Sequence, residues 1–120
     1  MSSSLFTDAA FDAAQAMDTV VRAVKGKPIS PQAAADGVTK LVEIADKLQK
    51  AARGLAFQLR TTAHGGNPAA GEQVVDLTAK VVDFLRNAEF EAGLTRDVLM
   101  DAHGGLGDVV DAVRGITFTF

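Results

Sequence analysis

The stretch AADGVTKLVEIADKLQKAARGLAFQL, residues 34–59, decides the fold of this chain. Its small and apolar residues recur at alternating spacings of four and three, at Ala34, Val38, Leu41, Ala45, Leu48, Ala52, Leu55 and Leu59. Such a heptad pattern, kept for more than three repeats, indicates an α-helix that packs one face along another helix. We expect this helix over about 31–64, because Ser30 is a good N-cap and Pro31 suits the first turn.

A second stretch carries the same spacing and supplies the partner helix. The positions are Val74, Thr78, Val81, Leu85, Ala88, Ala92, Thr95, Leu99 and Ala102. They predict a helix over about 69–102, antiparallel to the first in a hairpin, with each helix about 45 Å long. Val75, Leu77, Val82, Phe84 and Val98 widen its apolar face, so we expect it to touch two neighbours. Gly93 leaves open a break into two shorter helices, since glycine costs about 1 kcal/mol relative to alanine.

The flanking segments predict shorter elements. A stripe at Phe6, Ala10, Ala13, Met17, Val20 and Val24 predicts a helix over about 4–25 that ends at Gly26. Apolar residues between Leu106 and Val113 predict a fourth helix over about 106–114. The alternating pattern of residues 116–120 predicts an extended C-terminal tail. The expected fold class is all-α: an antiparallel three- to four-helix bundle in one domain, 1–120, built on the long hairpin.

Composition restricts the function. The chain has 120 residues, no cysteine and 48% hydrophobic residues, which fits one globular domain without disulfides or thiolate chemistry. It has neither a secretory leader pattern nor the roughly 20 apolar residues of a membrane helix, so we expect a cytoplasmic protein without a membrane partner. Residues 1–60 carry eight basic and six acidic side chains, and residues 61–120 carry four and nine. This acidic balance makes nucleic-acid binding an unlikely role.

The motif AHGG occurs twice and contains both histidines, His64 and His103. As a metal site the pair offers two ligands where a zinc site needs three or four, so these residues are weak candidates. The favoured interpretation is that each histidine lies in the last turn of a helix, where the helix dipole favours a cation and glycine provides the cap. In an antiparallel dimer, however, His64 of one copy could approach His103 of the other.

The sequence offers little for catalysis. Ser30 is better explained as an N-cap than as a nucleophile, and the acidic residues Glu89, Glu91, Asp97 and Asp101 have the spacing of a solvated helix face. We therefore expect no enzyme activity and no cofactor.

The remaining expectation is protein–protein interaction. Alanine at the seam brings helices close but buries little apolar area, so self-association in an assembly is the favoured function. Ile116, Phe118 and Phe120 are the candidate partner-binding residues, although they could equally cover the end of their own bundle. Two alternatives stay open. One is a carrier or sensor for a small apolar ligand or metal, and the other is a nucleic-acid-associated regulator that uses Lys40, Lys47, Lys50, Arg53 and Arg60.

Overall fold

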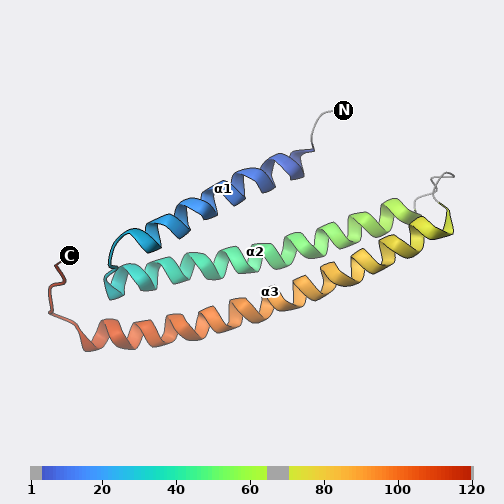
Figure 1. Ribbon diagram of the computed structural model, residues 1–120. Coiled ribbons are helices and arrows are strands. Elements are labelled where there is room, and N and C mark those ends of the chain that lie inside the picture. The colour runs from blue at the N-terminus through green and yellow to red at the C-terminus, as the bar shows by residue number, and fades with distance from the viewer. Residues whose placement is uncertain (1–3, 65–70, 120) are drawn as a thin grey trace.

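The computed structural model describes residues 4–64 and 71–119, and these form three helices (Figure 1). They are α1 (Leu5–Gly26), α2 (Pro31–His64) and α3 (Glu72–Ala112). The all-helical class is confirmed, and α1 and α2 begin and end within one residue of their predicted limits.

Serine caps start the first two helices, and the cap at Ser30 confirms the sequence prediction. The backbone N–H of Thr7 donates to Ser4 Oγ at 3.0 Å, and the backbone N–H of Ala33 donates to Ser30 Oγ at 3.2 Å. Each bond satisfies one of the N–H groups that a helix leaves without a partner in its first turn.

Among the described helices, α2 and α3 are the only two that pack closely, and they lie antiparallel (Figure 1). We call them the α2/α3 pair. The buried hydrophobic residues of the described chain all belong to this pair and are small: Ala35, Ala45, Ala52, Ala56, Val82 and Ala92. Small side chains let the two backbones approach, but they remove little apolar surface from water.

The seam between α2 and α3 differs from the predicted one at every second position. On α2 the sequence predicts that Leu41, Leu48 and Leu55 face α3. In the structure the residues that follow them, Val42, Gln49 and Ala56, face α3 instead. On α3, Val82 is 3% exposed whereas the expected Val81 is 46% exposed. The full α3 seam reads Val75, Thr78, Val82, Leu85, Glu89, Ala92, Arg96 and Leu99. The prediction favoured apolar residues, but the observed seam includes the polar Gln49, Glu89 and Arg96.

The predicted fourth helix over 106–114 is wrong, because α3 continues without interruption to Ala112. Its heptad spacing also continues, from Leu99 through His103 to half-buried Leu106, Val110 and Val113. Among the described residues only Gly115 has a positive φ, 86°, so the glycines after His103 adopt helical backbone. Mid-helix glycine is costly but compatible with a helix whose flanking turns keep their contacts.

Gly93 does not break α3; it is buried against α2. A Cβ atom at this position would lie 2.6 Å from Gln49 Nε2, so the glycine makes room for the Gln49 side chain. The reason for Gly93 is therefore the close approach of a neighbour rather than a change of direction.

Helix α1 does not complete a bundle with the α2/α3 pair. No residue of α1, which is described in full, is buried, and Leu5, Phe6, Phe11 and Val24 are all more than half exposed. Beyond Gly115, residues 116–119 have no regular secondary structure. The molecule measures 68 × 29 × 17 Å with a radius of gyration of 19.9 Å, against about 13.6 Å for a compact chain of this length. The molecule is thus an elongated rod, all-helical as expected, and its buried residues lie on α2 and α3.

Candidate interaction surface

An uncharged stripe runs along α2 beside the seam. Its members recur at spacings of three and four: Ala34, Gly37, Leu41, Ile44, Leu48, Ala51, Leu55, Gln58 and Thr62. Leu48 is 59% exposed and Ile44 is 39% exposed. Ala34, Leu41 and Leu55 are half-buried, so this second heptad repeat is covered only in part.

A matching stripe runs along α3 with a single charged member, Glu91. It comprises Val74, Leu77, Val81, Phe84, Ala88, Glu91, Thr95, Val98, Ala102, Gly105, Val109 and Ala112. Phe84 and Val98 are more than half exposed, and Val74, Val81 and Val109 more than two-fifths. The widened apolar pattern of Leu77, Phe84 and Val98 was the sequence signal for this second surface.

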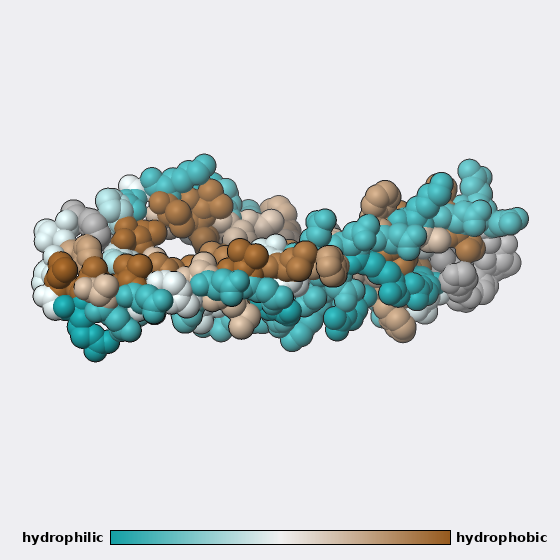
Figure 2. All heavy atoms as spheres, turned by 90° about the horizontal axis from the view of Figure 1, so that it is seen from below, coloured by the Kyte–Doolittle hydropathy of each residue, from teal (hydrophilic) through white to brown (hydrophobic). Residues whose placement is uncertain are grey.

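The two stripes lie on the same side of the α2/α3 pair. On both helices the inner members of the stripe directly precede seam residues: Leu48 precedes Gln49 and Val81 precedes Val82. Two antiparallel helices are related by a two-fold axis perpendicular to the plane that contains them. Residues that directly precede the seam residues therefore lie on the same side of the pair in both helices. Together the stripes form one surface, which we call the apolar face. In the left part of Figure 2 a band of hydrophobic atoms runs along the molecule, with hydrophilic atoms beside it.

Charged side chains border the apolar face along its two long edges, and on α3 exposed Lys80 occupies the same row as Asp101 and Asp108, three and four heptads earlier. Exposed Lys40 and Lys47 follow the outer edge on α2, and exposed Asp101 and Asp108 follow the outer edge on α3. Ion pairs across the seam join Arg96 to Asp46 and Arg53 to Glu89. In each pair the two residue numbers sum to 142, so residues of α2 and α3 whose numbers sum to about 142 lie at the same height. This register places Lys40 and Asp101 at the same height along the pair.

Polar groups fix the α2/α3 register on the side away from the apolar face. Arg96 Nη1 donates to Asp46 Oδ1 at 3.0 Å and to Gln49 Oε1 at 2.8 Å. Hydrogen bonds from Lys50 and Arg96 lower the pKa of Asp46, and the bond to Asp46 raises the pKa of Arg96. Arg53 Nε donates to Glu89 Oε2 at 2.8 Å one heptad away. Two such ties between the helices specify one alignment among those that a uniform alanine seam permits.

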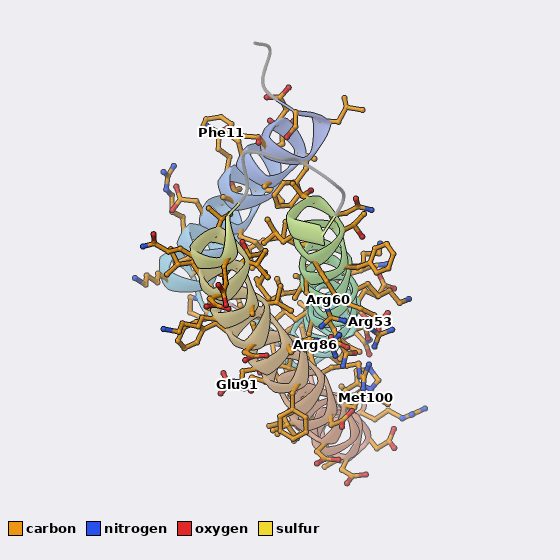
Figure 3. The ribbon with its side chains drawn as sticks, turned by 90° about the vertical axis from the view of Figure 1, so that its right-hand side faces the viewer. Phe11, Arg53, Arg60, Arg86, Glu91 and Met100 are labelled. Atoms are coloured by element: carbon orange, nitrogen blue, oxygen red, sulfur yellow. The ribbon has the colours of Figure 1, made fainter. Side chains whose placement is uncertain are left out.

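Three arginines gather on one side of the pair, whereas Lys40 and Lys47 border the apolar face. Figure 3 shows Arg53, Arg60 and Arg86 grouped together, with Glu91 on the far side of α3. Of the basic run proposed for nucleic acid, Lys40 pairs with Glu43 and Lys50 with Asp46, in addition to the Arg53 pair. Acidic partners therefore interrupt the run.

The candidate partner-binding residues of the tail lie at the end of their own chain. Ile116 and Phe118 line a pocket together with residues 30–32 at the start of α2 and Val110 and Val113 at the end of α3. Ile116 remains 60% exposed and Phe118 41%. Phe120 lies outside the described residues.

The structure does not bring the histidines together within one chain. His64 is the last residue of α2, and His103 is an exposed residue nine positions before the end of α3, so its predicted place in a last helical turn is wrong. In the observed register His103 is level with Thr39, about 37 Å from His64 along α2. Among the described residues, no group of three or more His, Asp or Glu is placed to hold a metal ion.

The first helix presents a further apolar surface. Phe6 lines a pocket with Gly54, Leu55 and Phe57 of α2, whereas Phe11 projects away from the other helices (Figure 3). None of the described helices has a segment long and apolar enough to cross a membrane.

No protein-family model, curated protein or solved structure matches this chain. The function is therefore argued from the surface itself.

Proposed function

We propose that the protein is a non-enzymatic interaction protein of the cytoplasm that associates with other protein chains, its own copies included, in an assembly. The observation that carries the proposal is the amount of surface left in contact with water. The chain exposes 9066 Å², whereas a compact monomer of 12.5 kDa exposes about 6,200 Å².

The kind of surface supports association as well as its amount. The excess of about 2,900 Å² includes a continuous apolar face on the helical hairpin and an α1 helix without a buried residue. Monomeric proteins rarely expose contiguous apolar patches larger than a few hundred Å², and larger ones mark sites of interaction. An assembly or scaffold role uses this surface.

A binding role also accounts for the polar groups. The ion pairs of α2 and α3 tie neighbouring helices or neighbouring turns together, as Arg53 does with Glu89. In this proposal they hold the rod in one alignment so that the apolar face stays continuous along it.

Native mass spectrometry of the chain, isolated from its own cells through an affinity tag, tests the proposal. We expect a species heavier than the 12.5 kDa chain. The variant Leu48→Glu, which places a charge on the apolar face, should lose that species. Recovery of the unmodified chain alone, at every concentration tested, would overturn the proposed function.

A further inference from the structure

We propose that the partner on the apolar face is a second copy of this chain, packed face to face so that α2 of each copy lies on α3 of the other. This inference rests on the proposed function and names its first partner. Two hairpins joined in this way form an antiparallel four-helix bundle, in which each helix has one neighbour from its own chain and one from its partner.

The geometry of the stripes fits this bundle. A helix in a square four-helix bundle needs two apolar seams about 100° apart, one for each neighbour. In α2 the seam through Gln49 and Ala56 and the stripe through Leu48 and Leu55 meet that requirement. In α3 the seam through Val82 and the stripe through Val81 do the same, since adjacent residues are 100° apart on a helix.

The exposed area is sufficient for a stable dimer. Obligate homodimers bury roughly 1,000–2,500 Å² on each chain. The chain exposes about 2,900 Å² more than a compact monomer of its mass. The apolar face runs along the two longest helices, whereas α1, with 22 residues, is shorter than the 34-residue α2 and cannot cover the face along its length.

Charge complementarity selects a second copy and its orientation. A two-fold interface is self-complementary, so each edge of the surface must suit the edge that rotation brings onto it. Rotation about an axis parallel to the helices places the Lys40 edge of one copy beside the Asp101 edge of the other at the same height. Rotation about an axis across the helices places the α2 edges together, and Lys47 then approaches Lys47 of the partner copy.

Dimer formation requires α1 to leave one end of the apolar face, because Phe6 lines a pocket with Ala51, Leu55 and Gln58 of that face. No α1 residue is buried, and α1 does not pack closely on the pair. Residues 27–30, which join α1 to α2, have no helical structure, so α1 can move aside as the faces meet.

Light scattering of the purified full chain gives the first test. We expect a mass of twice 12.5 kDa at micromolar concentration. Leu48→Glu should weaken the dimer about 30-fold or more, as charge at the centre of an interface does. The matched control Phe57→Glu changes an equally exposed residue of α2 that lies outside the apolar face, and it should leave the dimer intact. Circular dichroism verifies that both variants stay helical.

Disulfide trapping tests the orientation of the two copies. The chain has no native cysteine, so only the introduced thiols can form a disulfide. Tagged Leu48→Cys mixed with untagged Thr95→Cys should form a heterodisulfide in preference to either homodisulfide. Met100→Cys, on the opposite side of α3, is the control for Thr95→Cys and should give none. Leu48 homodisulfides alone would overturn the proposed orientation.

A purified chain that stays at 12.5 kDa up to 100 times the expected dissociation constant, about 0.1 mM for a micromolar dimer, would overturn the second-copy inference. The proposed function would fail only if the chain from cells were also alone. A cellular complex with a different protein on the Leu48 surface would therefore retain the function and refute the homodimer.

Discussion

The guanidinium of Arg96 lies 3.0 Å from the carboxylate of Asp46, across the seam between α3 and α2. Both side chains are about one-third exposed, at 29% and 35%. Their contact joins residues 50 positions apart in a seam whose fully buried members are mostly alanine. Such a contact contributes more to the choice of alignment than to the total stability, because partial exposure screens the ion pair.

The Asp46 carboxylate should make the stability of the pair depend on pH. Its folded pKa is lowered by hydrogen bonds from Lys50 and Arg96, so its stabilising effect is complete above its unfolded pKa of about 3.9 and is lost as pH falls through the folded pKa. We expect Asp46→Asn to lower the melting temperature by a few degrees at pH 7. The difference from the unmodified chain should shrink as the pH falls below about 4 and through the lowered folded pKa. A difference that stays constant from pH 7 to pH 2.5 would contradict this role, and Asp83→Asn on the exposed surface of α3 is the control.

Gly104 offers a test of the continuous α3. A Cβ atom at this position meets nothing within 4 Å, and the backbone is helical. Gly104→Ala should therefore raise the free energy of unfolding by about 0.5–1 kcal/mol. Gly115→Ala should instead lower it by about 1 kcal/mol, because φ is 86° there. Urea denaturation measures both. Loss of stability in Gly104→Ala would support the predicted helix end after His103 and contradict the structure.

Gly93 should respond in the opposite way to Gly104 although both are in α3. An added Cβ would lie 2.6 Å from Gln49 Nε2 and displace the side chain that accepts a hydrogen bond from Arg96. We expect Gly93→Ala to lower the free energy of unfolding by about 1 kcal/mol, as overpacking does. In a Gln49→Ala background the same change should stabilise, since only the helix preference remains. Equal effects in the two backgrounds would show that Gln49 is not the cause.

Val82 and Val81 separate the observed seam from the expected one. Val82 is 3% exposed and Val81 is 46% exposed. Val82→Ala should lower the free energy of unfolding by about 2 kcal/mol at any protein concentration, because it removes buried apolar surface and leaves a cavity. Val81→Ala should lower the free energy of unfolding of the dilute monomer by less than about 0.5 kcal/mol. The decrease should be larger only at concentrations at which the chain associates. Urea denaturation at two protein concentrations provides the measurement, and a larger effect of Val81→Ala in dilute solution would reverse the assignment.

The sequence predicts elements better than it predicts their contacts. Serine caps at Ser4 and Ser30 and the stop at His64 are local features, and the limits of α1 and α2 follow from them. The heptad count could not separate the two adjacent stripes of each helix, because Leu48 is more apolar than Gln49, and Val81 and Val82 are the same residue type. Which stripe meets the neighbour depends on Gln49, Glu89 and Arg96 finding partners across the seam, and that is a property of two helices together. The prediction of a helix end at the second AHGG is wrong for a similar reason, because glycine after His103 permits a helix to end there without requiring it.

The tail provides the last prediction, which concerns whether residues beyond Gly115 stabilise their own chain or bind another. Phe118 lies in a pocket with Pro31 and Val113 and is 41% exposed. Phe118→Ala should therefore lower the free energy of unfolding by about 1 kcal/mol, a fraction of the cost for a fully buried phenylalanine. The mass in solution should stay unchanged, because the tail lies at the end of the rod and not on the apolar face. Thr117→Ala is the control for a neighbouring change outside the pocket. If Phe118→Ala abolished association and left monomer stability intact, Phe118 would be a partner-binding residue and the apolar face would not be the principal interface.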